Sequence, residues 1–273
     1  MQKDCLSEKS INDKLQTQYF ARTLKLLETV DSTQQYIKQQ DTASLPEGYT
    51  VVADEQTDGR GRLGRKFYSP AREGIYLSIL LRPKISLADI QFLTICAAVA
   101  VCRAIESVCD IEVDIKWVND IYYRGAKLCG IITEASISAE LQEADYVTLG
   151  IGVNTGEVAP EVRDIASSIH EISNIRGIRN VLIAEILNRF ERVYFDFTLH
   201  GKKKDILDAY IEKMFLIGRC VEVTAPTGKY EAKVIGLSDA GALLIQTTDG
   251  EILNINTGEI SVKEKEKCRK RNC

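Results

Sequence analysis

The chain has 273 residues, of which 45% are hydrophobic and 27% charged, and its formal net charge at pH 7 is −4. This composition is that of a folded globular protein, and the length favours one large domain with a small one. The negative net charge excludes a general attraction to nucleic acid or to an anionic membrane. The longest apolar run, Ile95 to Cys102, is too short to span a membrane, and the polar amino terminus lacks a signal-peptide core. We therefore expect a cytoplasmic protein.

The predicted elements begin after a polar segment, residues 1–20, which we expect to be flexible. Apolar runs bounded by turn residues predict strands at 23–30, 49–53, 74–81, 113–118, 128–135 and 146–153. Helical composition and spacing predict helices at 34–40, 87–108, 181–199 and 204–215.

The texture of the sequence changes after Gly218, where short β-rich runs are separated by turns that contain Gly, Asp or Pro. This pattern is typical of a small all-β barrel. We therefore divide the chain into a flexible segment, a main domain, a barrel and a charged tail, at residues 1–20, 21–216, 217–262 and 263–273.

Residues 59–66 read GRGRLGRK and are called here the Gly/Arg loop. Its three glycines let the backbone approach a ligand closely, and its four cations supply charge, so the loop is suited to an anion such as a phosphate. The loop satisfies G-x-G-x-x-G, but a dinucleotide fingerprint must open a helix, and here Phe67 to Pro70 and a strand follow. A Walker loop also fails, because Phe67 takes the Ser/Thr place. On its own, a solvated basic turn remains an alternative interpretation.

Further polar motifs follow the expected strands in a fixed order. An Asn-Asp pair ends the strand-like run KWVND, a lysine follows a short connection later, and a Gly-rich strand ends in asparagine. The series is Ser32-Thr33-Gln34, Gln56, the Gly/Arg loop, Lys116 to Asp120, Lys127 with Gly130-Ile131, and Gly150 to Asn154.

This series resembles the biotin protein ligases, also called biotin–[acetyl-CoA-carboxylase] ligases, and the resemblance extends from Leu24 to Val262. It implies an α+β fold: a mixed β-sheet catalytic domain packed with helices, similar to class II aminoacyl-tRNA synthetases, with a carboxy-terminal SH3-like β-barrel. Regulatory members carry an additional amino-terminal helix-turn-helix domain, for which the residues before Leu24 are too few. We therefore expect a single-function form with no DNA partner, and the resemblance allows a homodimer.

The chemistry implied by the resemblance has two half-reactions. The biotin carboxylate attacks the α-phosphorus of ATP, which gives biotinyl-5′-AMP and pyrophosphate. A lysine of a biotin carboxyl carrier protein then attacks the mixed anhydride. Two anions must meet in the first step, so the site needs positive charge, and Mg²⁺ is an expected companion of ATP.

The resemblance also implies roles for individual residues. The expected catalytic residues are Lys127, Arg62 and Asp120, the last either as a base or as an orienter of Mg²⁺. The expected biotin-binding residues are Ser32, Thr33, Gln34, Gln56, Arg60, Gly61, Arg62 and Lys127. The expected ATP- and adenylate-binding residues are Arg62, Arg65, Lys116, Asn119, Asp120, Lys127 and Asn154. For Trp117 a core position is the favoured interpretation over contact with adenine.

Two other functions remain open at this point. A lipoate or octanoate ligase would share the fold and the adenylate chemistry. A nucleic-acid-binding protein of a different class would use the Gly/Arg loop, the barrel and the basic tail, against which the net charge and the scarcity of interleaved aromatic residues argue.

Overall fold

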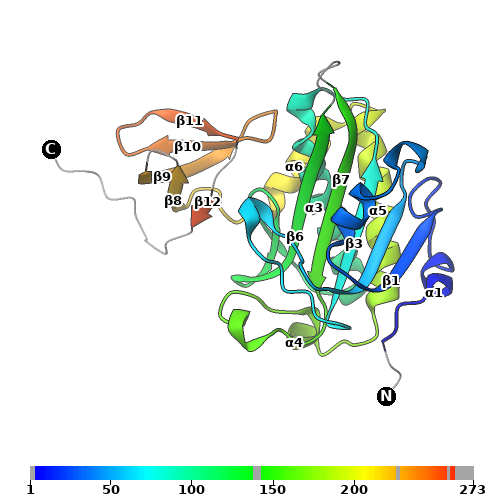
Figure 1. The fold of residues 1–273 in the computed structure, drawn as a ribbon. Coiled ribbons are helices and arrows are strands. Elements are labelled where there is room, and N and C mark those ends of the chain that lie inside the picture. The colour runs from blue at the N-terminus through cyan, green and yellow to red at the C-terminus, as the bar shows by residue number, and fades with distance from the viewer. Residues whose placement is uncertain (1–3, 138–142, 226–227, 257–258, 262–273) are drawn as a thin grey trace.

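The structure is a computed structural model that describes residues 4–137, 143–225, 228–256 and 259–261. It contains a seven-stranded sheet of order β1-β2-β3-β7-β6-β5-β4 and a five-stranded sheet of order β11-β10-β9-β8-β12 (Figure 1). The predicted charged tail, residues 263–273, lies outside the described residues.

The first sheet is mixed, because β1 runs parallel to β2 and the remaining neighbours pair antiparallel. Its strands are β1 (Leu24–Val30), β2 (Thr50–Gln56), β3 (Gly74–Leu81), β4 (Asp114–Lys116), β5 (Asp120–Tyr123), β6 (Ala126–Ile137) and β7 (Ala144–Asn154). The helices are α1 (Glu8–Asn12), α2 (Thr33–Lys38), α3 (Phe92–Cys109), α4 (Ile169–Ser173), α5 (Arg179–Thr198) and α6 (Lys203–Lys213). Together with the antiparallel second sheet described below, this confirms the predicted fold class.

The two faces of the sheet differ along β7, whose side chains alternate between them. Val147, Leu149 and Val153 are fully buried in the core that the sheet shares with α3 and α5, and Figure 1 shows these helices stacked behind the strands. The residues between them, Gly150 and Gly152, belong to the opposite face. That face therefore has room for a ligand where the helical face has none.

Helix α3 is the central core helix. The stretch Leu87–Cys109 is long and apolar enough to cross a membrane by length and composition, but 78% of its apolar window is buried against the rest of the protein. A helix that packs between a sheet and another helix is apolar on most of its sides. The small alanines in the middle of α3 let the sheet and α5 approach it closely. The first part of the predicted helix 87–108 is instead a 3₁₀ turn, Leu87–Asp89.

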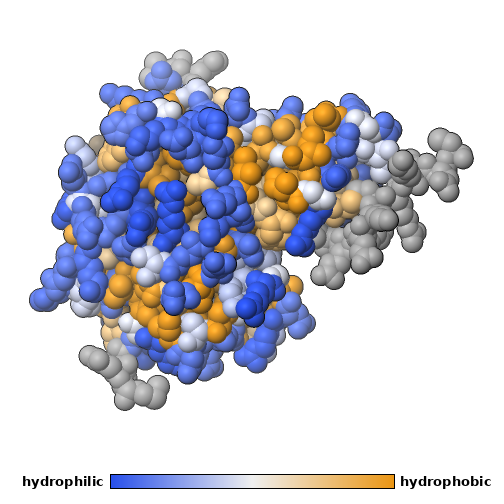
Figure 2. Space-filling view, turned by 180° about the vertical axis from the view of Figure 1, so that it is seen from behind, coloured by the Kyte–Doolittle hydropathy of each residue, from blue (hydrophilic) through white to orange (hydrophobic). Residues whose placement is uncertain are grey.

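The second sheet is antiparallel and small. Its strands are β8 (Cys220–Ala225), β9 (Gly228–Leu237), β10 (Leu243–Thr247), β11 (Ile252–Ile255) and β12 (Glu259–Ser261). Val221, Val234 and Ile245 on one face of this sheet are buried and belong to the same hydrophobic cluster as the core of the main body. Its other face is partly apolar, as the rear view in Figure 2 shows, with Ile235 and Ile252 exposed.

The expectation of a flexible segment before residue 21 is wrong for residues 4–20. Helix α1 packs on α5, and Ile11 and Phe20 are fully buried. The carboxylate of Glu191 on α5 accepts hydrogen bonds of 2.6, 2.8 and 2.7 Å from the backbone N–H groups of residues 18, 19 and 20. Polar composition misled the prediction, because a few buried apolar side chains and the backbone bonds to Glu191 are enough to hold this segment.

Candidate active site

Two adjoining pockets lie on the face of the sheet opposite α3 and α5. The outer pocket has a volume of about 360 Å³ and the inner one about 50 Å³. Both are lined by the same boundary residues, which are Gly61, Arg62, Phe67, Tyr76, Asn119 and Lys127. A ligand with two chemically different ends can therefore occupy both pockets at once.

Much of the inner pocket is lined by neutral polar side chains that bond to one another, and its cations come from the Gly/Arg loop and Lys127. Thr33, at the start of α2, donates its backbone N–H to Gln56 Oε1 at 2.9 Å, and its hydroxyl lies 2.7 Å from that of Ser78. Gln56 donates in turn to Ser69 Oγ at 3.0 Å. Ser32, the amino-terminal cap residue of α2, makes no side-chain capping bond and lines the pocket. This network holds the polar groups in place before any ligand arrives.

Gln34 reaches the inner pocket from α2, and its Nε2 donates to both oxygens of Thr148, the carbonyl at 3.3 Å and the hydroxyl at 3.2 Å. Glycines of β6 and β7 form the floor beneath it. A Cβ on Gly150 would lie 3.0 Å from Gln34, and one on Gly152 would lie 2.5 Å from the Phe67 ring. Larger residues here would fill the space that the pocket offers.

The Gly/Arg loop is a closed turn rather than an extended strap. Gly61 N–H donates to Arg65 O at 2.7 Å, and Phe67 N–H donates to Gly59 O at 2.8 Å. At its tip Leu63 adopts a left-handed conformation, with φ of 57°, and is 72% exposed. The loop thereby presents its cations along one side of the two pockets.

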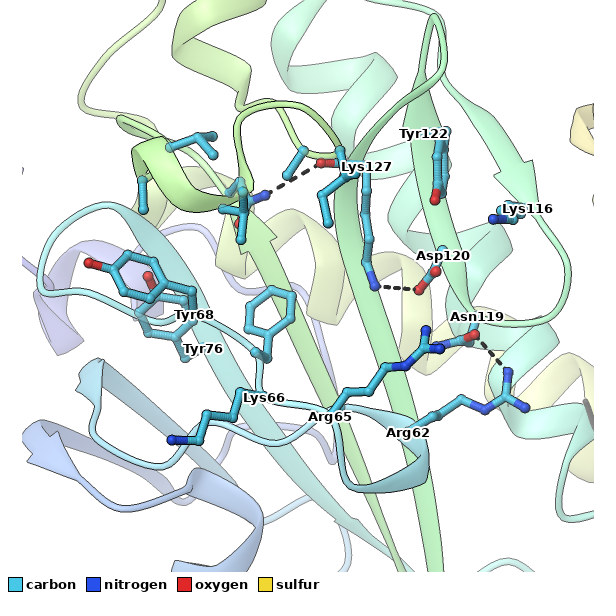
Figure 3. Close-up of a pocket in the computed structure, with 18 of the residues that line it drawn as sticks. Arg62, Arg65, Lys66, Tyr68, Tyr76, Lys116, Asn119, Asp120, Tyr122 and Lys127 are labelled. Atoms are coloured by element: carbon cyan, nitrogen blue, oxygen red, sulfur yellow. Dashed lines mark hydrogen bonds and ion pairs between the residues drawn. The ribbon is translucent and has the colours of Figure 1, made fainter. Parts of the chain in front are cut away.

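Two cations of the Gly/Arg loop, Arg62 and Arg65, and Lys127 on β6 converge on the Asn-Asp turn between β4 and β5, as Figure 3 shows. Arg62 Nη1 donates to Asn119 Oδ1 at 2.9 Å. Asn119 is itself fixed, because its Nδ2 donates to Ile131 O at 2.9 Å. The guanidinium groups and the ammonium group thus surround a single region of the outer pocket.

Lys127 and Asp120 form an ion pair, with Nζ and Oδ1 2.7 Å apart. The same Oδ1 is buried and has no hydrogen bond of good geometry, so the contact is electrostatic. Lys127 also lies 5.9 Å from the centre of the Phe67 ring, on the boundary between the two pockets. A charged ammonium at this boundary can contact anionic groups in either pocket.

The far wall of the outer pocket comes from β7 and the segment after it. Asn154 Nδ2 donates to Ser167 O at 3.1 Å, and Lys127 N–H donates to Ile165 O at 3.0 Å.

Two tyrosines also line the outer pocket, and both are largely buried. Burial raises the pKa of Tyr122 to about 12, and it raises the pKa of Tyr76 well above its usual range. Both phenols are therefore neutral hydrogen-bonding groups at physiological pH.

Two family models match the chain. Residues 26–154 match the biotin/lipoate A/B protein ligase family, and residues 216–263 match the biotin protein ligase C-terminal domain. The chain is 37% identical over 251 residues to the bifunctional ligase/repressor BirA of Bacillus spizizenii, covering 90% of this chain and 76% of that protein. The chain belongs to the biotin protein ligase family. It is also 27% identical to the biotin–[acetyl-CoA-carboxylase] ligase of Mycobacterium tuberculosis, covering 78% of this chain and 79% of that protein.

Solved structures agree with this membership. The biotin protein ligase of Aquifex aeolicus in complex with biotin and ATP superposes with a TM-score of 0.75 at 34% identity, covering 88% of this chain and 98% of that chain. The likeness therefore extends over nearly nine tenths of the chain.

All residues predicted from the ligase resemblance line one of the two pockets. The predicted biotin-binding residues that line the inner pocket are Ser32, Thr33, Gln34, Gln56, Arg60, Gly61, Arg62 and Lys127. The predicted adenylate-binding residues that line the outer pocket are Arg62, Arg65, Lys116, Asn119, Asp120, Lys127 and Asn154. The side chain of Arg60 is about half exposed and pairs with Asp58 Oδ2 at 3.0 Å.

Other lining residues of this ligase site received no assignment from the sequence. The glycine floor was part of the motif series, but its contact with Gln34 and Phe67 depends on strand register, which aligns Gly130 with Gly152. The apolar residues Val158, Val162 and Ile165 of the outer wall stand in a segment that carries no motif. A period-two run of glycines on neighbouring strands is the signal that could have indicated the floor.

Proposed function

We propose that the protein activates biotin with ATP to form biotinyl-5′-AMP and then transfers the biotinyl group to a lysine of a biotin carboxyl carrier protein. One observation carries this proposal: a small pocket of neutral, mutually bonded side chains opens at Lys127 into a larger pocket on which cations converge. A neutral ureido ring fits the first environment, and a carboxylate beside a triphosphate fits the second.

In the first half-reaction, a carboxylate oxygen of biotin attacks the α-phosphorus, and the bond from phosphorus to the leaving pyrophosphate breaks. We assign Lys127 to the meeting point of the carboxylate and the α-phosphate, because it lies on the boundary of both pockets. Arg62 and Arg65 offset charge on the phosphates. Preorganised charge of this kind stabilises the transition state more than the separate substrates.

Mg²⁺ fits this site as an ion that enters with ATP. Among the described residues there is no group of three or more His, Cys, Asp or Glu side chains that could hold a metal by itself. Asp120, Glu73 and Glu157 are the carboxylates that line the outer pocket, and Asp120 is the one that lies beside the cations. One carboxylate with substrate phosphates is a common ligand set for Mg²⁺. When bound, the ion supplies charge that helps pyrophosphate to leave.

In the second half-reaction, the amine of a carrier lysine attacks the carbonyl carbon of the anhydride, and AMP leaves. We assign Asp120 to orienting Lys127, to which it is paired at 2.7 Å, and Asn119 to the adenylate. We expect the reaction to take place in the cytoplasm, where ATP and the carrier protein occur together.

The inner pocket supports biotin over lipoate, because polar groups line it, and an apolar dithiolane ring could not use the hydrogen-bonding capacity that they keep beyond their bonds to one another. The test is exchange of labelled pyrophosphate into ATP with biotin, lipoate or octanoate as the acid. We expect exchange with biotin alone. Exchange with lipoate or octanoate instead would identify a different acid, and no exchange with any of them would overturn the enzymatic proposal.

A further inference from the structure

The second sheet contacts the segment that leads into the outer pocket. The indole Nε1 of Trp117 donates a buried hydrogen bond of 3.0 Å to the carbonyl oxygen of Gly241. Gly241 lies in the turn between β9 and β10, 124 residues further along the chain. A second contact, from Gln91 Nε2 to Asn256 O at 2.8 Å, is solvent-exposed and does not involve the segment that leads into the pocket.

The turn is held firmly where it meets the main body. Gly241 N–H donates to Ser238 O at 2.8 Å, and Ser238 N–H donates to Ala242 O at 2.8 Å. Gly241 has a φ of 81°, and a Cβ there would come within 2.3 Å of Ile95 Cδ1 on α3. The position of the accepting carbonyl is therefore set by close packing as well as by the turn itself.

Val118, the residue after Trp117, is also fixed by a buried hydrogen bond from α6. Tyr210 on α6 is fully buried, and its hydroxyl donates to Val118 O at 3.1 Å. The next two residues are Asn119 and Asp120, whose side chains enter the outer pocket. Trp117 itself is 4% exposed and is also one of the residues that line the outer pocket. The segment before the Asn-Asp turn thus has buried bonds from two sides.

We propose that Trp117 is a positioning residue through which the β9–β10 turn of the second sheet fixes Asn119 and Asp120 for adenylate formation. This inference rests on the proposed ligase function. Loss of the indole bond lets the Asn-Asp turn shift relative to the cations, and small misplacements of this kind reduce rates strongly. Most of the inner pocket is built from other strands and from α2, and Asn119 is the one residue of this turn that reaches its boundary. We therefore expect biotin binding to depend little on this bond.

The first test replaces Trp117 by Phe, which keeps an aromatic ring and removes the N–H donor. The matched control is Gln91→Leu, which removes the exposed hydrogen bond from Gln91 to the carbonyl oxygen of Asn256. We expect Trp117→Phe to lower kcat/KM for ATP in pyrophosphate exchange by about 10- to 100-fold, with the Kd for biotin within about twofold. We expect Gln91→Leu to retain wild-type exchange. Equal kcat/KM values in the two variants would overturn the inference.

The second test leaves the pocket unchanged. Gly241→Ala strains the turn and displaces it from Ile95, whereas its control Gly250→Ala, at a φ of 94° in the β10–β11 turn, meets nothing within 4 Å. Trp117 is the single tryptophan of the chain, so its fluorescence reports on the contact in both variants. We expect red-shifted emission and reduced kcat/KM for ATP with Gly241→Ala alone. A red shift with unchanged exchange would contradict the inference.

The two proposals fail separately. Absence of biotin-dependent exchange in the wild-type protein refutes the ligase function. Wild-type exchange that is insensitive to both Trp117→Phe and Gly241→Ala refutes only the positioning role.

Discussion

The inner and outer pockets share a boundary but are built in different ways. Neutral side chains from α2, β2 and β3 surround the inner pocket and bond to one another, as Thr33, Gln56 and Ser78 do. Charged side chains from an exposed loop and a turn lie along the outer pocket, where Arg62 donates to Asn119 and Lys127 forms an ion pair with Asp120. The first arrangement favours selection of one uncharged group, and the second favours adaptation to a highly charged ligand.

The largest expected effect comes from Lys127→Met, which removes the charge on the boundary. We expect the rate of adenylate formation at saturating biotin and ATP to fall by about 100- to 1000-fold, the range seen when one charge-stabilising donor is lost. Biotin Kd, measured by titration, should change less than about threefold. Equal losses in rate and affinity would remove the distinction between the pockets.

Lys213→Met is the matched control for this variant. Lys213 pairs with Glu106 at 2.5 Å, and its side chain is 31% exposed, against 29% for Lys127. The pair lies between α6 and α3, away from both pockets. We expect this variant to keep the wild-type rate of adenylate formation.

The converse effect is expected from Gly152→Ala in the floor of the inner pocket. The added Cβ would lie 2.5 Å from the Phe67 ring, which must then move toward the ligand space. Overpacking of this size costs about 1–3 kcal/mol, so biotin Kd should rise about 10- to 100-fold. The rate at saturating biotin should fall much less. A selective loss of rate would mean that the floor belongs to the reacting centre.

Limited trypsin digestion tests whether the Gly/Arg loop, which lines both pockets, becomes ordered when ligands bind. The Gly/Arg loop offers Arg60, Arg62, Arg65 and Lys66 as cleavage sites, and Leu63 at its tip is mostly exposed. We expect biotin with ATP to slow cleavage within residues 59–66 by about tenfold, because a loop that closes over its ligands becomes ordered and less accessible to the protease. Cleavage at an unchanged rate would contradict closure of the loop over the ligand.

The motif series predicted most of the residues that line the two pockets, because its fixed order resembles one ligase family. Asn119 and Lys127 are among them, and the roles assigned to them stay predictions. Strand β5 was missed, since its four residues, Asp120–Tyr123, merge with the turn after them. The bond from Trp117 to Gly241 joins residues far apart in the chain, and no local pattern indicates such a contact.

Outside both pockets, the contact of residues 18–20 with Glu191 tests whether support of the fold is separate from activity. Glu191→Gln keeps the shape but halves the acceptor capacity and removes the charge. We expect chemical denaturation to show a loss of about 1–3 kcal/mol in the free energy of unfolding. Biotin Kd and the exchange rate of the folded variant should stay at wild-type values. A change in either would link this segment to the site.

The smallest effect concerns Asp89 and Lys203, which are 2.5 Å apart at the start of α3. The hydrogen bond from Lys203 lowers the pKa of Asp89, so this pair stabilises the fold above the usual Asp pKa of about 3.9 and loses its contribution as the pH falls through the lowered value. Both side chains are about a third exposed, so we expect Asp89→Asn to cost less than about 1 kcal/mol at pH 7. Denaturation curves at pH 7 should therefore separate the variant from the wild type slightly, and the separation should shrink as the pH falls below the usual Asp pKa.

The central claim is that the acid bound in the inner pocket attacks the α-phosphorus of ATP in the outer pocket. Biotin labelled with ¹⁸O in both carboxylate oxygens tests this directly, with hydroxylamine as the acceptor of the biotinyl group. Mass spectrometry should find one ¹⁸O atom in the released AMP, one in the biotinyl hydroxamate and none in pyrophosphate. Unlabelled AMP, or label in pyrophosphate, would contradict the mechanism.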